Sequence, residues 1–216
     1  MQRELITSNW YALFLFISLS CCALTNFLKP RIYVDLLKIP FNNRYFINAK
    51  DKPSFEAATL LLIVNYILML GLLIYVSFLY FNDHYSFSVL HFLTIIAGLI
   101  GFMSFKFLIE YLISWVFDIK DIVTYYLFEK FAFIKQTGIF LIPFILLMIF
   151  STLDKKVVII SSIIVFSVLK VGGFIIVLRK NQKYINSHFF YFLLYLCALE
   201  IAPYILIYSV LSNSNF

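Results

Sequence analysis

The chain has 216 residues, of which 63% are hydrophobic and 13% are charged, and its net charge is +6. Because about a quarter of the residues in soluble domains are charged, this composition excludes an ordinary water-soluble protein and indicates a membrane protein. We expect the excess of lysine and arginine to interact with the anionic headgroups of the bilayer and not with nucleic acid.

Six apolar stretches follow one another along the chain, each near or above the ~20 residues that a helix needs to cross a bilayer. They are apolar on every face, without the alternation typical of barrel strands. In lipid only helices of this kind satisfy their own backbone groups. The predicted fold is an all-α integral membrane protein, a single domain of six transmembrane helices with short loops and interfacial amphipathic segments. The expected spans are about 10–28, 55–79, 88–117, 132–152, 156–178 and 188–211.

The first stretch has one alternative interpretation, a cleaved signal, because "SLSCC" follows an apolar run and Arg3 precedes it. Its small-residue pattern is imperfect, and the basic "LKPR" comes directly afterwards, so a retained span is favoured. The cysteines of the chain lie in apolar spans without metal-ligand spacing, which is typical of small buried hydrophobic residues. They are Cys21, Cys22 and Cys197.

The basic residues predict the orientation of the chain. Lysine and arginine stay in the cytoplasm near short loops. Six spans put both termini on one side, where three basic residues flank the spans, and put twelve on the other side. We therefore expect a multi-pass protein of the bacterial inner membrane with both termini in the periplasm. The twelve are Lys29, Arg31, Lys38, Arg44, Lys50, Lys52, Lys120, Lys130, Lys135, Arg179, Lys180 and Lys183.

Two stretches on the expected cytoplasmic side carry most of the polar sequence. The loop 31–55 is basic and is interrupted by Pro40 and Pro53, which predicts a segment that lies on anionic headgroups, with a partner surface as the alternative. The stretch 118–138 alternates charges with aromatic residues at helical spacing. It predicts an interfacial helix that leads into the fourth span at Gly138.

Four charged residues lie away from the ends of the expected spans, at membrane depth, with Asn65 as a polar companion. Each costs at least ~2.5–3.5 kcal/mol at membrane depth, so such groups face protein or water and usually pair. Lys106 and Glu110 are four residues apart on one helix, and Lys170 and Glu200 have nearly matching depths on consecutive spans. We predict two charge pairs that fix helix register, with a proton or ion path as the alternative.

Proline residues predict kinks in two of the helices, and small residues predict places where helices pack closely. Pro143 and Pro203 each remove a helical hydrogen bond, which predicts kinks in the fourth and sixth spans. The second kink would lie beside Glu200. Ala97 and Gly101, four residues apart, predict a packing face in the third span. Gly172 and Gly173, beside Lys170, allow either close packing or a local break in the helix.

Searches for catalytic and metal-binding motifs find none, so we expect no cofactor and no metal. His84 and His91 are seven residues apart and could share a helix face, but further ligands are not evident. Asp118 and Asp121 are the only cytoplasmic candidates for a lipid-modifying enzyme, and solvated helix-end acids are the more ordinary interpretation.

Two stretches resemble an uncharacterised membrane family of Bacteroidota, known as domain of unknown function 4271. "FYFLLYLCALEIAP" resembles its C-terminal signature, and "YYLFEKFAFIKQTGIFLIPF" resembles its central stretch. The resemblance implies a polytopic inner-membrane protein of a Gram-negative envelope and implies no activity. The matching positions are Tyr195, Leu196, Cys197, Leu199, Glu200 and Pro203 in the first stretch, and Tyr126, Phe128, Gly138, Leu141 and Pro143 in the second.

These patterns favour a non-catalytic structural subunit or assembly factor of a cell-envelope complex, which contacts other membrane proteins. The loops are too short for a soluble catalytic domain, and the charges inside the spans can cancel. The alternative is a small proton-coupled transporter or channel component that uses Glu200 as an intramembrane acid. An inverted repeat, common in such transporters, is not visible in the sequence.

Overall fold

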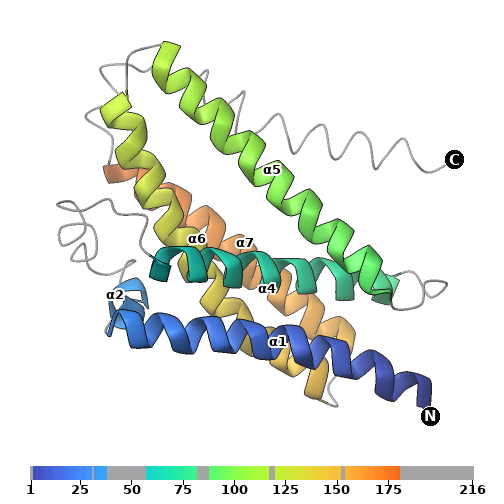
Figure 1. Ribbon diagram of the computed structural model, residues 1–216. Coiled ribbons are helices and arrows are strands. Elements are labelled where there is room, and N and C mark those ends of the chain that lie inside the picture. The colour runs from blue at the N-terminus through green and yellow to red at the C-terminus, as the bar shows by residue number, and fades with distance from the viewer. Residues whose placement is uncertain are drawn as a thin grey trace, which may run out of the picture.

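The computed structural model describes residues 2–30, 32–37, 57–81, 88–116, 120–151 and 154–180. Every regular element in these segments is an α-helix (Figure 1). The elements are α1 (Gln2–Leu28), α2 (Ile32–Leu37), α4 (Ala57–Phe81), α5 (Val89–Val116), α6 (Lys120–Phe150) and α7 (Lys155–Lys180).

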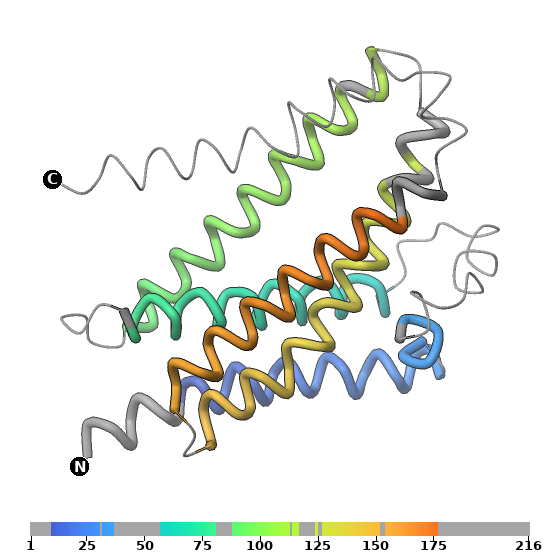
Figure 2. Tube along the Cα trace, turned by 180° about the vertical axis from the view of Figure 1, so that it is seen from behind, coloured from blue at the N-terminus to red at the C-terminus, as the bar shows by residue number. Residues whose placement is uncertain are grey.

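Successive long helices run in opposite directions, so the bundle has two ends (Figures 1 and 2). The N-terminal end holds the start of α1 and the junctions between α4 and α5 and between α6 and α7. The α2 end holds α2, the last turn of α1 and the junction between α5 and α6. This alternation is the one that short loops between membrane-crossing helices require.

Helix α4 is the centre of the bundle and contacts α1, α5, α6 and α7. Towards the N-terminal end, Met69, Leu72 and Tyr75 of α4 pack with Leu141 of α6 and Phe92 of α5 in the larger buried cluster. A smaller cluster near the α2 end joins α2 to α4 and α6. It contains Ile32, Leu36, Ala58, Leu62, Ala132 and Phe133.

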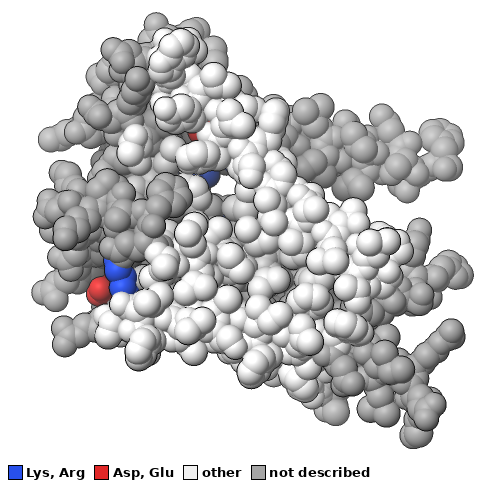
Figure 3. All heavy atoms as spheres, viewed as in Figure 1, with Lys and Arg blue, Asp and Glu red and all other residues white. Residues whose placement is uncertain are grey.

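Five of the helices are long and apolar enough to cross a membrane. The face in Figure 3 agrees with this, because charged atoms of the described residues show at only two places on it. The apolar stretches are Trp10–Leu28, Ala57–Tyr80, Val89–Val116, Leu127–Phe150 and Lys155–Ile176. The sixth expected span, 188–211, lies outside the described residues, so the count of six stays a prediction.

The expected fourth span, 132–152, differs from the structure at its start. Residues 120–150 form one uninterrupted helix, and its apolar stretch begins at Leu127. Of the segment 118–138, which was expected to lie at the interface, the part from Leu127 onward is packed within the bundle, where Glu129, Lys135 and Gln136 are buried. The physical reason is that neighbouring helices cover these polar side chains.

Helix α5 lies at the periphery of the described bundle. Only 6% of its apolar stretch is buried, compared with 44% in α4. It touches α4 near the N-terminal end and then diverges from it towards the α2 end, where it meets α6 (Figures 1 and 2). A helix this apolar and this exposed requires lipid or another protein along its outer face.

Candidate functional site

A buried ion pair joins α5 to α6. The ammonium of Lys130 donates a hydrogen bond to Oε1 of Glu110. The Glu110 side chain is 2% exposed, and the Lys130 side chain is 23% exposed. The rings of Phe107 and Phe131, with centroids 6.0 Å apart, pack between the same two helices. The pair neutralises a carboxylate that would be very costly to bury alone.

The sequence predicted Lys106 as the partner of Glu110, and that pairing stays a prediction. The contact with Lys130 was missed because Lys130 lies on another helix, twenty residues away along the chain. Sequence spacing detects partners on one helix face, whereas partners on different helices follow from packing. The sequence offered one indication of this contact: Lys130 lies in a stretch without glycine or proline, which allows a continuous helix through it.

Lys170 lies over aromatic rings in the middle of the bundle. Its Nζ is 4.8 Å from the ring centroid of Tyr66 on α4 and 5.6 Å from that of Phe166 on α7. Such contacts attract an ammonium to the face of a ring. Glu200, the predicted partner of Lys170, lies outside the described residues, so this pair stays a prediction.

Asn65 connects α4 to α1 through a hydrogen bond in which the Ser18 hydroxyl donates to Oδ1 of Asn65. Both side chains are completely buried. The other atom of the amide, Nδ2, has no hydrogen-bond partner in the part of the chain that the structure describes. Asn65 therefore presents an unused donor inside the bundle.

Gly138 brings the backbone of α6 directly onto α4 beside Asn65. A Cβ atom at this position would lie 2.9 Å from Cα of Tyr66 and 3.2 Å from Nδ2 of Asn65. A Cβ atom is essentially never found within 3.0 Å of an atom of another helix, so only glycine fits here. Ser18, Asn65, Tyr66, Gly138 and Lys170 together form a layer across α1, α4, α6 and α7, which we call the polar layer.

The polar layer supplies hydrogen-bond donors and one cation but no carboxylate. General acid–base chemistry usually requires a group whose pKa is tuned near neutrality. The described layer connects α1, α4, α6 and α7 through these contacts.

Helix α6 carries further buried polar side chains that the sequence interpretation placed at the interface. Glu129 is completely buried, and Lys135, Gln136 and Thr137 are at most 2% exposed. The Thr137 hydroxyl donates to the carbonyl of Phe133 at 2.8 Å, which satisfies it locally. This half of α6 is thus the most polar part of the described interior.

The small residues expected at packing faces divide into two groups. A Cβ at Gly173 would lie 2.8 Å from Cγ of Phe133, so α6 and α7 pack closely there. A Cβ at Gly101 or Gly172 would meet nothing within 4 Å. Ala97 is also exposed, on the outer face of α5.

Of the two prolines predicted to kink helices, Pro143 lies in the interior of α6, which continues through it to Phe150. The kink itself stays a prediction. Pro203 lies outside the described residues, as do Cys197, His84 and Asp118. The side chain of Asp121 is likewise not described.

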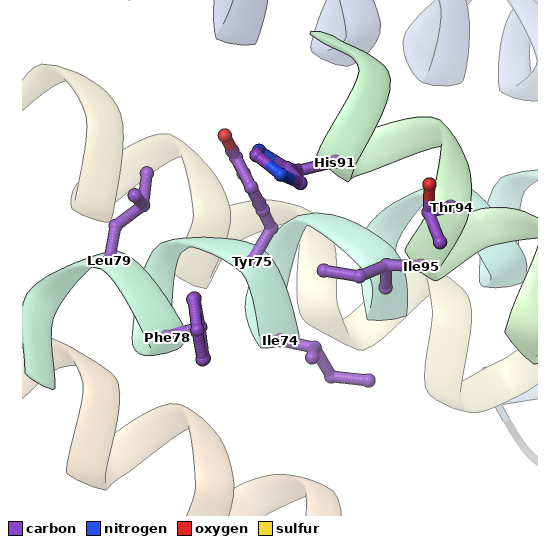
Figure 4. Close-up of a pocket in the computed structure, with 7 residues that line it drawn as sticks. All are labelled: Ile74, Tyr75, Phe78, Leu79, His91, Thr94 and Ile95. Atoms are coloured by element: carbon purple, nitrogen blue, oxygen red, sulfur yellow. The ribbon is translucent and has the colours of Figure 1, made fainter. Parts of the chain in front are cut away.

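A pocket of about 480 Å³ lies between α4 and α5 near the N-terminal end of the bundle. Figure 4 shows its seven lining residues, with His91 beside the hydroxyl end of Tyr75. Among the residues searched for metal ligands, which are those the structure describes, there is no group of three or more histidine, cysteine or acidic side chains. The pocket is mainly apolar, with Tyr75, His91 and Thr94 as its polar members.

Comparison with known proteins identifies a family and nothing closer. Curated proteins gave no match, and neither did solved structures. One family model matches residues 11–211 and carries the description "Domain of unknown function (DUF4271)". Because this match covers almost the whole chain, the protein belongs to the DUF4271 family.

Proposed function

We propose that this protein is a multi-pass inner-membrane protein with both termini in the periplasm, and that it is a non-catalytic subunit or assembly factor of a cell-envelope complex. The orientation rests on the excess of lysine and arginine beside the ends of the spans on the α2 side. The proposed activity is lateral contact with another membrane protein.

The observation that carries this proposal is the outer face of α5. Ala97, Gly101, Ser104 and Leu108 follow one another at helical spacing, and all four are exposed. Small residues on such a face allow the backbone of another helix to approach closely. We propose that a transmembrane helix of a different envelope protein packs there.

Site-specific photo-crosslinking in native membranes tests the proposal. A photoreactive amino acid at Gly101 should give a crosslink to one unlike membrane protein, and the same residue at Ser104 should capture the same protein. The control position is Phe16, a residue of α1 that is 71% exposed. It should capture only lipid or nothing.

A second arm separates a specific partner from a frequent neighbour. Gly101→Trp should reduce recovery of that protein with the chain, because the indole fills the space the partner helix would occupy. Crosslinks only between copies of this chain, or equal capture from Phe16 and Gly101, would overturn the proposal.

The alternative function, proton-coupled transport, is favoured by one observation. Asn65 Nδ2 and Gln136 Nε2 are buried donors without partners among the described residues, and an acceptor such as the Glu200 carboxylate would satisfy one of them. Proton flux into proteoliposomes that disappears in Glu200→Gln, at normal protein abundance, would support this function. Absence of flux under an imposed proton gradient would count against it.

A further inference from the structure

The pocket between α4 and α5 is open towards the side of the bundle. Ile74 is 39% exposed and Phe78 is 45% exposed, although both line the pocket. Since both helices are long and apolar enough to cross a membrane, this opening faces lipid. A molecule that enters the pocket therefore arrives from the bilayer and not from water.

The pocket extends along the axes of α4 and α5. His91 lies two residues after the start of α5 and Ile95 four residues further on, which places Ile95 about 6 Å deeper at 1.5 Å per residue. Ile74 lies seven residues before the end of α4. Phe78 and Leu79 lie three and two residues before that end, at about the level of His91. The pocket thus runs inward from the helix ends, with His91 near its outer end and with Ile74 and Ile95 deeper.

Two of the three polar lining groups are already engaged. The Tyr75 hydroxyl accepts a hydrogen bond from the Ser88 amide at 2.9 Å and donates to the Ser88 carbonyl at 3.2 Å. The Thr94 hydroxyl donates to the carbonyl of Leu90 at 2.9 Å. These bonds fix the start of α5 and the wall of the pocket, and they leave His91 as the polar group that can serve a ligand.

His91 is placed to bind a headgroup. Its imidazole is exposed, and Figure 4 shows it at the pocket beside Tyr75. Its ring nitrogens make no hydrogen bond to the residues that the structure describes. An imidazole has one N–H donor when it is neutral and two when it is protonated. Phosphate oxygens are strong hydrogen-bond acceptors.

We propose that the α4–α5 pocket binds one membrane phospholipid, with an acyl chain against Ile74, Phe78 and Ile95 and with the phosphate accepting a hydrogen bond from His91. The volume of about 480 Å³ lies within the range of small-molecule pockets, which are mostly apolar with a few polar groups that fix orientation. The pocket thereby holds its lipid longer than the surrounding surface holds bulk lipid.

The test uses the full chain in nanodiscs that contain phosphatidylethanolamine with a diazirine on one acyl chain. After irradiation, mass spectrometry of peptides locates the labelled residues. The wild type should be labelled preferentially at the pocket. His91→Leu should reduce this labelling about tenfold, the equivalent of one hydrogen bond to a charged group, whereas His91→Gln, which retains a donor, should stay close to the wild type.

Filling the pocket gives an independent variant. Thr94→Trp should abolish preferential labelling, and Ile74→Trp repeats the test from the other helix if the first variant unfolds. The control is Ile100→Trp, because Ile100 is 47% exposed on the same helix but does not line the pocket. Labelling at Ile100 equal to that at the pocket, or pocket labelling unchanged in both filled variants, would mean bulk lipid only and would overturn the proposal.

Discussion

Gly138 of α6 lies so close to Tyr66 of α4 that a Cβ atom at position 138 would be 2.9 Å from the Cα of Tyr66. The neighbouring atom belongs to the backbone, so it cannot move aside as the end of a flexible side chain can. The contact fixes the distance between the two helices that form the centre of the bundle, and the polar layer depends on it.

Gly138→Ala should therefore destabilise the protein, although alanine is the better helix former. The overpacking cost, typically about 1–3 kcal/mol, exceeds the gain in helix propensity of about 1 kcal/mol. Thermal unfolding in detergent measures the difference. Gly98→Ala is the control, because a Cβ at Gly98 would meet nothing within 4 Å. A Gly138→Ala protein as stable as the control would show that α4 and α6 are not held at this distance.

Two adjacent glycines of α7 should respond differently to the same substitution. At Gly173 a Cβ would lie 2.8 Å from Cγ of Phe133, while at Gly172 it would meet no atom within 4 Å. Gly173→Ala should lower the unfolding temperature, and Gly172→Ala should leave it unchanged or raise it, because alanine favours the helix. Equal effects at the two positions would contradict the observed orientation of α7 on α6.

The Glu110–Lys130 pair should behave as a unit. Lys130→Met alone should cost about 3–5 kcal/mol, because it leaves the buried Glu110 carboxylate without this cation. Glu110→Gln should cost less, because the Lys130 side chain is 23% exposed. The double variant should recover most of this loss. Membrane abundance and detergent unfolding of the four proteins measure the coupling. Additive losses would mean that Glu110 has another principal partner, and Lys106→Met then tests the partner predicted from the sequence.

Tyr33 should give the protein a dependence on alkaline pH. Its hydroxyl donates to the carbonyl of Cys22 at 2.6 Å, and burial raises the pKa of the phenol above its ordinary value of 10.0. Because the folded pKa is the higher one, this contribution is complete below pH 10 and is lost as the pH rises through the folded pKa.

Unfolding of the wild type and Tyr33→Phe at a series of pH values measures this effect. At pH 8 the wild type should be more stable by about 0.5–1.5 kcal/mol, the worth of one hydrogen bond. The difference should shrink above pH 10. Tyr111→Phe, at a residue 58% exposed, controls for loss of a phenol, and a difference that is constant from pH 8 to 11 would exclude the proposed cause.

The sequence alone located four of the long helices to within a few residues in their apolar parts. The expected 88–117 and 156–178 compare with Val89–Val116 and Lys155–Lys180. This succeeded because each helix coincides with a long apolar stretch of about the ~20 residues that a membrane-crossing helix needs. The sequence placed the start of the fourth span at residue 132, whereas the apolar stretch of α6 begins at Leu127 and includes the buried Glu129. Whether a side chain is buried depends on the residues around it in space, and the sequence shows only its neighbours along the chain.

The candidate site was less predictable than the fold. The sequence singled out Asn65, Glu110 and Lys170 because ionisable and amide groups are costly in an apolar span. It could not show that Ser18 bonds to Asn65 or that Lys130 bonds to Glu110, because those contacts depend on how the helices pack. The sequence placed Gly138 only where an interfacial helix was expected to lead into the fourth span. Its close contact with Tyr66 of α4 is evident only from the positions of both helix backbones.

The Glu110–Lys130 pair also bears on how the protein is made. A helix that emerges from the ribosome with Glu129, Lys130 and Lys135 in its first half is a poor substrate for insertion by itself, because each charge costs about 2.5–3.5 kcal/mol on translocon scales. Helix α5 precedes α6 directly in the chain and carries the counter-charge for one of these residues. In the proposed membrane topology, helices α5 and α6 are therefore expected to leave the translocon together as a hairpin, so loss of Glu110 should affect the topology of α6 during synthesis before it affects the folded protein.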